Sequence, residues 1–287
     1  MSKILVTGAD GRVGHQVTRH LASRGAEIRL HFQGAPAATT REQYETVSGD
    51  YGDLEAMSRA FDGVESAFLY APDSRISAAL FKAAKARGVT KVVLLSSASV
   101  VKAPPGNNPI VERHRTAEIE VASAGLDWTF IRPDILASNC LQWTDSIKRS
   151  GSVFTPFPHS LRSPIHESDV GLAISVALLD ARANQQAFNI TGLSLISIRE
   201  QVESIAKYLG RSIKCVEISD SEAVQQMAET APNLTLEARQ KLVDYLRKCV
   251  DTPPPLTEDF ERLVGHPPRH FDEWVSDNIM SFSGSPR

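Results

Sequence analysis

The sequence has few cysteines, no long apolar run and no excess of basic charge. Its cysteines, Cys140, Cys215 and Cys249, lie far apart without a CxxC pair. They offer no disulfide framework and are typical of a reducing compartment. No span approaches the roughly 18 apolar residues that a membrane helix needs, and the N-terminal residues enter a strand pattern without a signal sequence. We therefore expect a cytoplasmic protein with no membrane partner.

The charge balance also limits the partners. The 287 residues carry a formal net charge of −3 and have a pI near 6.3, so no global field favours phosphate backbones and no nucleic acid is expected. No metal site is expected, because five of the histidines form no ligand-spaced cluster with Cys, Asp or Glu. These histidines are His20, His31, His159, His266 and His270.

The first 190 residues alternate short apolar runs with amphipathic stretches. Within 74–87, apolar residues follow the spacing of one buried helix face, and Gly25, Gly88 and Gly125 mark helix ends. The predicted strands are 3–7, 27–32, 45–50, 66–71, 91–97, 128–133 and 187–192. Strict strand–helix alternation predicts an α/β fold with a doubly wound parallel sheet of the Rossmann type.

The pattern changes after about residue 193. We expect a Rossmann domain over 1–192, with a substrate-side excursion at about 139–165, and a smaller α/β substrate-binding region over 193–287. Within the latter, 197–210 is a predicted helix with a capping box, and 213–218 is a predicted strand.

The strongest chemical signal is the sequence TGADGRVG at residues 7–14, directly between a strand and a helix. Gly8 permits a tight turn, Gly11 leaves room for a pyrophosphate, and Gly14 lets the helix pack closely. This context predicts dinucleotide binding. The expected loop contacts are Thr7, Gly8, Asp10, Gly11, Arg12, Val13 and Gly14.

The second predicted strand favours NADP(H) over NAD(H). In NAD-binding sites, an Asp or Glu about 20 residues beyond the loop usually hydrogen-bonds the ribose 2′-OH. The stretch 28–36 contains no acid, and Arg12 in the loop could neutralise a 2′-phosphate. A solvated surface position is the alternative for Arg12.

These segments resemble the atypical, NmrA-like branch of the short-chain dehydrogenase/reductase superfamily. The glycine loop matches its TGxxGxxG pattern, 94–99 its serine-ending fifth strand, and 117–133 its helix and Arg-Pro strand. Residues 163–178 and 257–275 resemble its later segments. The resemblance implies an NADP-binding domain with a small substrate domain, in a family of reductases and non-catalytic redox sensors.

The resemblance also implies particular cofactor contacts. Asp50 would reach the adenine, and the Arg-Pro ending in Pro133 would lie by the nicotinamide. The other expected cofactor contacts are Tyr51, Tyr70, Ala71, Pro72, Ser96 and His114.

The usual catalytic pair of the superfamily is missing. Catalytic members use a Tyr as proton donor, a Lys four residues later and often a Glu after four more. Aligned on Glu118, His114 occupies the lysine position and Ile110 the tyrosine position. Isoleucine has no proton to give, so the usual acid is absent.

Several substitutes remain open. His114 has an ordinary pKa near neutrality, and Ser97, with Ser96 as fallback, could hold the substrate oxygen. Tyr70 could face the nicotinamide, although packing is its simpler role. If the acceptor stabilises its own anion, water can deliver the proton and the protein supplies chiefly orientation.

The sequence therefore predicts an NADPH-dependent reductase of an activated carbonyl. The expected substrate is a small aromatic or polyketide-like ketone or quinone, as in ketoreductase steps of antibiotic biosynthesis, and the protein is a monomer or homodimer. Expected substrate contacts are Asn139, Trp143, Phe154 and Phe157, with loop packing as the alternative. The rival hypothesis is a non-catalytic NADP sensor.

Overall fold

The computed structural model describes residues 3–103, 106, 108–232 and 234–284. It divides into two compact units, which are described separately. Unit 1 comprises Met1–Asp134, Glu167–Ile190 and Glu258–Pro267, and unit 2 comprises Ile135–His166, Thr191–Thr257 and Pro268–Arg287. Residues 258–267, which the sequence analysis groups with 193–287, thus pack in unit 1.

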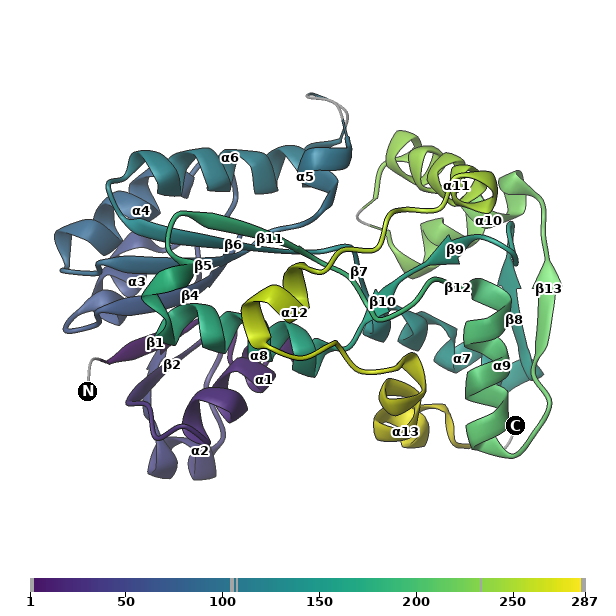
Figure 1. Ribbon diagram of the computed structural model, residues 1–287, viewed down its shortest axis with the longest axis horizontal. Helices are drawn as coiled ribbons and strands as arrows, with labels where there is room; N and C mark the ends of the chain where they lie inside the picture. The colour runs from purple at the N-terminus through teal and green to yellow at the C-terminus, as the bar shows by residue number, and fades with distance from the viewer. Residues whose placement is uncertain (1–2, 104–105, 107, 233, 285–287) are drawn as a thin grey trace. The chain divides into compact units, whose positions relative to one another are not determined.

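Unit 1 is built on a seven-stranded sheet with the order β11-β6-β5-β4-β1-β2-β3, in which every neighbouring pair is parallel (Figure 1). Its strands are β1 (Ile4–Val6), β2 (Ile28–Phe32), β3 (Glu45–Ser48), β4 (Ser66–Tyr70), β5 (Lys91–Leu95), β6 (Asp127–Pro133) and β11 (Gln186–Ile190). Each lies within a strand predicted from the sequence or extends it by one residue, and the doubly wound α/β class is confirmed. The strand order reverses between β1 and β4, which is where such sheets bind ligands, outside the carboxyl ends of the strands.

Helices cover both faces of this sheet (Figure 1). One face carries α1 (Arg12–Ala22) and α8 (Glu167–Leu179), with α12 (Asp259–Val264) against α8 and β11. The other carries α3 (Leu54–Phe61), α4 (Ser77–Ala86) and α6 (Pro109–Ser123). The short elements of unit 1 are α2 (Ala38–Gln43), α5 (Ser99–Lys102) and η2 (Ala181–Ala183). Large apolar side chains such as Phe61, Phe81 and Leu94 fill the layer under α3, α4 and α6.

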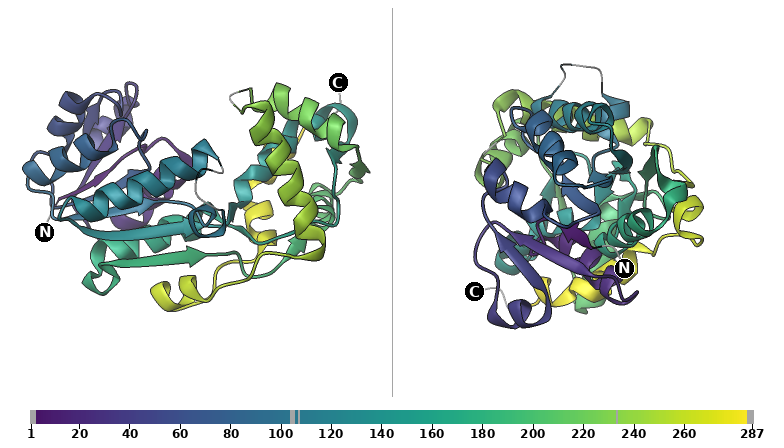
Figure 2. Two further views of the ribbon diagram at one scale, coloured as in Figure 1. Left: turned by 90° about the horizontal axis from the view of Figure 1, so that it is seen from above. Right: turned by 90° about the vertical axis from the view of Figure 1, so that its left-hand side faces the viewer.

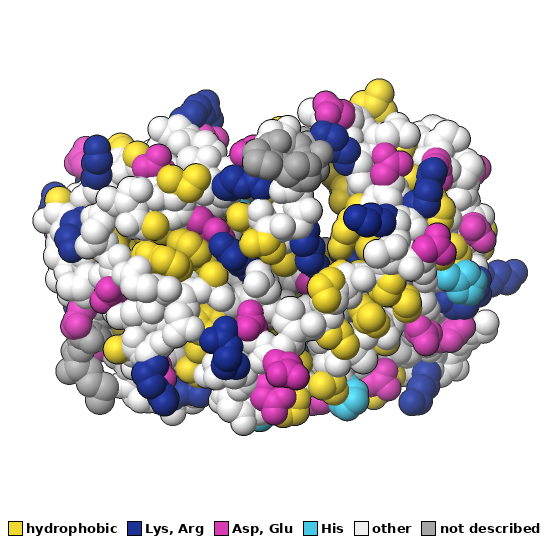
Figure 3. Space-filling view, turned by 45° about the horizontal axis from the view of Figure 1, so that its top comes forward, with side chains coloured by type: hydrophobic (Ala, Val, Ile, Leu, Met, Phe, Trp, Pro, Cys, Tyr) yellow, Lys and Arg dark blue, Asp and Glu magenta, His cyan; other side chains and the backbone are white. Residues whose placement is uncertain are grey.

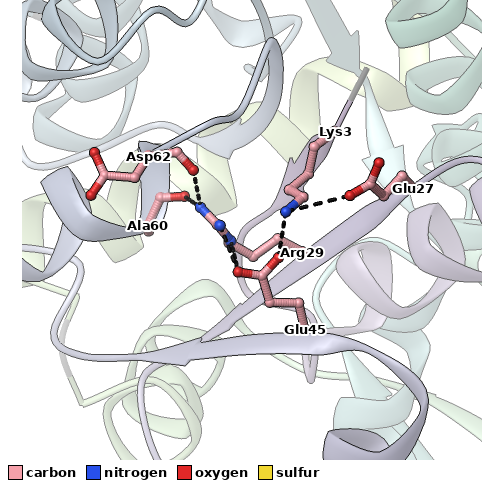
Figure 4. Close-up of polar contacts among 6 residues, drawn as sticks. All are labelled: Lys3, Glu27, Arg29, Glu45, Ala60 and Asp62. Atoms are coloured by element: carbon pink, nitrogen blue, oxygen red, sulfur yellow. Dashed lines mark hydrogen bonds and ion pairs between the residues drawn. The ribbon is translucent and has the colours of Figure 1, made fainter. Parts of the chain in front are cut away.

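Arg29 ties β2 to β3 and to the end of α3 (Figure 4). Its Nε and Nη2 donate to Glu45 Oε1 at 2.9 and 2.6 Å, and its Nη1 donates to the carbonyls of Ala60 and Asp62 at 2.9 and 2.5 Å. Lys3 Nζ donates to the other oxygen of Glu45 at 2.7 Å. The charge of Arg29 is therefore fully engaged in holding the sheet together.

Unit 2 combines three two-stranded sheets with helices around a core of its own. Its elements are β7 (Ile135–Leu136), η1 (Ala137–Trp143), α7 (Thr144–Ser150), β8 (Ser152–Thr155), β9 (Leu161–Arg162), β10 (Pro164–Ile165), β12 (Ile196–Ser197), α9 (Ile198–Leu209), β13 (Lys214–Glu217), α10 (Asp220–Thr230), α11 (Leu236–Asp251) and α13 (Phe271–Phe282). Strand β10 pairs with β7 and β13 with β8 in parallel, and β12 pairs with β9 antiparallel. Helices α10 and α11 pack side by side (Figure 2).

The local predictions for this region are confirmed. Ser197 and Glu200 form the capping box of α9, which ends at Gly210 in the left-handed conformation, and β13 lies within the predicted strand at 213–218. The core of unit 2 is formed by buried side chains that include Ile147, Val202 and Trp274.

The surface has mixed charge. In Figure 3, Lys and Arg side chains are interspersed with Asp and Glu side chains over the face in view. Among the residues described, no helix is long and apolar enough to cross a bilayer.

Candidate functional site

The glycine loop lies between β1 and α1, at the carboxyl edge of the sheet. Gly8 has φ 56°, a left-handed conformation that glycine adopts without a Cβ clash. A Cβ on Gly14 would lie 2.1 Å from the Gly8 carbonyl oxygen, so α1 packs onto the loop only with glycine at this position. Thr7 donates its hydroxyl to the Phe68 carbonyl at 2.9 Å, which anchors the loop to β4. Val13 is buried, whereas Asp10 and Arg12 are exposed.

Tyr70 lies directly against this loop. Its hydroxyl oxygen accepts the Gly14 N–H at 3.0 Å, and a Cβ on Gly8 would lie 2.7 Å from its ring. Gly11, whose sequence-based role is to leave room for a pyrophosphate, also leaves room for this ring, because a Cβ there would lie 3.1 Å from the Tyr70 hydroxyl. Burial raises the pKa of Tyr70, which weakens it as an acid. We therefore retain its packing and cofactor-side role and not a catalytic one.

The segment after β3 continues the same wall. Tyr51 donates its hydroxyl to the Tyr70 carbonyl at 2.8 Å, and burial raises its pKa. The exposed Asp50 accepts the Gly52 N–H at 2.6 Å, which shapes the turn. Beyond β4, Ala71 is half-buried and Pro72 is buried. The Arg12 side chain makes no hydrogen bond or ion pair with another described residue, so its guanidinium is free to meet an anion.

At the ends of β5 and β6, Ser96 belongs to a buried network. Its hydroxyl donates to Glu118 Oε1 at 2.5 Å. The Glu118 carboxylate also accepts from Arg132 Nε at 2.8 Å and from Arg132 Nη2 at 2.5 Å. A hydroxyl that donates to a buried carboxylate is not available to a substrate oxygen, so we do not retain Ser96 as a fallback catalytic residue. Pro133 is buried at the end of β6.

Ser97 has a different environment. Its half-buried hydroxyl lies 2.8 Å from the Ser99 hydroxyl and accepts the Ser99 N–H at 3.2 Å. If Ser99 donates in the first contact, Ser97 accepts both bonds and keeps its own proton for a substrate oxygen. This arrangement is compatible with an oxygen-orienting role.

Helix α6 carries the stretch that replaces the usual catalytic pair. The Ile110 side chain is exposed at the start of the helix. Burial, with a smaller contribution from Arg113, lowers the pKa of His114 to about 4, so its imidazole is neutral at pH 7. A role for His114 as the proton donor needs a pKa near neutrality. The lowered pKa argues against that role. Its Nδ1 is buried without a hydrogen-bond partner among the described residues.

Sequence reasoning missed a cation at this edge of the sheet. Lys102 ends α5, just after Ser97, and its Nζ pairs at 2.5 Å with Oδ1 of Asp134, which follows β6. The Asp134 side chain is 4% exposed and that of Lys102 is 29% exposed. The order Ser-Ser-x-x-x-x-Lys at 96–102 is a possible sequence signal, but only the sheet register brings residue 134 beside it.

The proposed substrate residues all lie in unit 2. Trp143 packs against the unit 2 core, and Phe157 lies under the Arg247 guanidinium at 5.4 Å. Phe154 is half-buried on β8, and Asn139 is exposed on η1. Ordinary packing accounts for Trp143 and Phe157, and a substrate role for all four stays a prediction.

The residues of unit 1 fit a dinucleotide phosphate. The loop is built from glycines, Gly11 at the start of α1 contributes no capping side chain, and helix N-termini favour anions. A separate pocket of about 440 Å³, lined by residues that include Ile4, Lys91 and Asp127, lies at the amino ends of the strands. It is at the wrong edge for this cofactor.

Known proteins share this architecture. Residues 8–178 match the NAD(P)H-binding family. The chain is 31% identical over 289 residues to (4-alkanoyl-5-oxo-2,5-dihydrofuran-3-yl)methyl phosphate reductase of Streptomyces griseus subsp. griseus, covering 98% of this chain and 99% of the relative.

Two solved structures share the fold. Triphenylmethane reductase of Citrobacter sp., complexed with NADP(H), has a TM-score of 0.79 at 19% identity, covering 96% of this chain and 99% of that one. NmrA, a negative transcriptional regulator in complex with NADP, has a TM-score of 0.73 at 18% identity, covering 97% and 95%.

The match to a named reductase over almost the whole chain decides between the two hypotheses of the sequence analysis in favour of an enzyme. The resemblance to NmrA-like proteins is likewise confirmed. The chain belongs to the NAD(P)H-binding family, shares its fold with triphenylmethane reductase and NmrA, and is an oxidoreductase that uses NAD(P)H.

Proposed function

We propose that the protein reduces small conjugated acceptors, namely quinones, activated aromatic ketones or enones, and that the acceptor itself holds the negative charge formed. The observation that carries this proposal is the absence of an available acid among the described side chains of 110–118 and 96–97. Ile110 is apolar, His114 is neutral at pH 7 because its pKa is about 4, and Ser96 donates to Glu118.

Two cations of this region, Lys102 and Arg132, are also neutralised. Lys102 pairs with Asp134, and Arg132 pairs with Glu118. Their positive charge is therefore already balanced by carboxylates, which weakens any attraction to a localised oxyanion. An acceptor that spreads its charge over two oxygens or an aromatic ring depends less on such help.

When bound, NADPH would supply hydride, that is, one hydrogen nucleus with two electrons, with loss of a nicotinamide C–H bond and formation of NADP⁺. The electron-poor carbon of the acceptor would gain the C–H bond, the π pair would move onto the conjugated oxygen, and water would deliver the proton afterwards. Ser97 orients that oxygen through its hydroxyl. Positioning of the two reactants can account for about 7–11 kcal/mol of the barrier without an acid.

The relative from Streptomyces griseus supports this chemistry. Its named substrate carries a ring double bond conjugated with both a lactone carbonyl and an alkanoyl ketone. An anion formed at such a position is delocalised over both carbonyls. The proposal transfers this property, and not the particular compound, to the present chain.

NADPH oxidation with matched acceptors tests the proposal. A 4-acyl-5-oxo-2,5-dihydrofuran is compared with the same ring lacking the acyl group, and a hydroxyquinone with a saturated ketone. We expect kcat/KM to be at least about a hundredfold higher for the doubly activated member of each pair, which corresponds to about 2.7 kcal/mol. Equal rates within each pair would contradict the proposal.

A further inference from the structure

His31 is a buried histidine without a described role, on the second strand of the sheet. It is 1% exposed, and neither ring nitrogen has a partner in good hydrogen-bond geometry among the described residues, although the Gly49 backbone lies close enough to favour the protonated ring. Buried polar groups are paired in most cases, and an unpaired one costs about 1–3 kcal/mol. A group retained at that cost calls for an explanation.

Its position connects it to the cofactor loop. The His31 carbonyl accepts the Ala9 N–H at 3.2 Å, within the glycine loop. The imidazole lies 6.1 Å from the Tyr51 ring, centroid to centroid. Tyr51 donates to the Tyr70 carbonyl, and Tyr70 accepts from Gly14 at the start of α1. A continuous chain of contacts thus runs from the unpaired imidazole to the dinucleotide-binding loop.

His31 lies near the end of the second strand, which in dinucleotide-binding folds lies close to the ribose 2′ position. In dinucleotide-binding folds, a side chain about 20 residues beyond the glycine loop meets either the 2′-OH or the 2′-phosphate. His31 is the penultimate residue of β2. The other cation of this strand, Arg29, cannot respond to a phosphate because Glu45 and two carbonyls hold it (Figure 4).

Opposing influences act on the imidazole. Burial disfavours its protonated form most strongly and lowers the pKa of His31, whereas the nearby Gly49 backbone and the carboxylates of Asp10 and Asp50 favour the protonated form. Tyr51 faces it with its ring. Helix α1 packs on β2 through buried residues such as Val13 and Val17, while its charged Arg12, His15 and Arg19 are exposed. In the free protein, His31 is therefore neutral at neutral pH. One added negative charge nearby would favour its protonation.

We propose that His31 takes up a proton when NADP(H) binds and so supplies the positive charge by which the site distinguishes the 2′-phosphate from a 2′-hydroxyl. The inference depends on cofactor binding alone and stands whichever acceptor is reduced. Because a bound proton is then part of the complex, NADPH affinity falls as pH rises, whereas NADH affinity does not change.

Isothermal titration calorimetry of the full chain tests this directly. NADPH and NADH are titrated at pH 7.5, where the 2′-phosphate is already mostly dianionic, in buffers of different ionisation enthalpy. We expect uptake of up to about one proton with NADPH and none with NADH. The Kd for NADPH should rise by up to about tenfold per pH unit above neutrality.

His31→Gln, with exposed His15→Gln as matched control, assigns the proton. His31→Gln should abolish the uptake and the pH dependence and weaken NADPH more than NADH, while His15→Gln should retain both. No uptake in the wild-type protein, or unchanged uptake in folded His31→Gln, would overturn the proposal. So would an equal loss of NADPH and NADH affinity. Should His31→Gln fail to fold, the imidazole NMR signals of the wild-type chain decide the matter: with NADPH a buried imidazolium must appear, and its absence overturns the proposal.

Discussion

At the scale of single residues, the site is defined by which polar groups are already engaged. Ser96 and Ser97 are neighbours in sequence, yet Ser96 donates to the buried Glu118, whereas Ser97 lies among groups that can donate to it. The same type of side chain therefore has two different capacities. If Ser99 donates in its contact with Ser97, then of these two serines only Ser97 keeps a proton to offer to a substrate oxygen.

Replacing Ser97 tests this difference. We expect Ser97→Ala to lower kcat by about tenfold, or about 1.4 kcal/mol, which is less than the loss of a full oxyanion-hole donor because the acceptor shares its charge. Ser123→Ala, at an exposed serine that bonds only a carbonyl of its own helix, serves as the control and should change kcat little. Steady-state NADPH oxidation with a quinone measures both, and an unchanged kcat in Ser97→Ala would remove the assigned role.

His114 makes a prediction about stability. Its pKa is lowered from 6.5 to about 4 in the fold, so between these values the unfolded chain binds more protons than the folded one. The stabilisation from the neutral imidazole is therefore present above pH 6.5 and is lost as pH falls toward 4. Because His114 is only half-buried by surface area, we expect an effect on the order of 1 kcal/mol.

Urea unfolding at pH 7 and pH 5 measures this effect. His114→Gln should lose less stability on acidification than the wild-type chain, and exposed His15→Gln should behave like the wild type. An identical pH dependence in all three proteins would show that the imidazole is not held neutral by its surroundings.

At the scale of elements, the loop between β1 and α1 is fixed by close backbone contact. The Cβ of an alanine at position 14 would lie 2.1 Å from the Gly8 carbonyl oxygen and 3.1 Å from the Thr7 carbonyl oxygen. Both contacts are to backbone, which cannot rotate away as a flexible side chain can. The helix would have to move off the strand.

Gly14→Ala is therefore expected to destabilise the chain by about 3 kcal/mol or more, the upper range for overpacking, and to abolish NADPH binding. Gly34→Ala provides a matched control for stability, because a Cβ there meets no atom within 4 Å. Chemical denaturation and a fluorescence titration with NADPH measure the two effects. A Gly14→Ala protein with wild-type stability would contradict the packing described for α1.

At the scale of the whole molecule, the sequence predicts the elements of unit 1 far better than its assembly. Seven apolar runs and the glycine loop determine the parallel sheet, because buried parallel strands are apolar throughout. In contrast, the return of 258–267 to unit 1 depends on α12 packing against α8 and β11. No local pattern encodes such a long-range contact.

The candidate site likewise contains parts that the sequence predicts and parts that it does not. The loop glycines can be predicted, since each is required by its local backbone geometry. The Lys102–Asp134 pair and the Ser96–Glu118–Arg132 network were not, because they join residues 14 to 32 positions apart through the sheet register. The altered pKa of His114 likewise depends on burial, which a single sequence does not give.

For the whole molecule, we propose that this reductase works without an acid from the protein because its acceptor holds the negative charge. The most direct measurement is NADPH turnover with a doubly activated acceptor and with its singly activated counterpart, over pH 6 to 8. We predict at least about a hundredfold preference for the former and no dependence of kcat on an imidazole near pH 6.5. Equal turnover of both acceptors, or a kcat that falls as an imidazole loses its proton, would contradict the account.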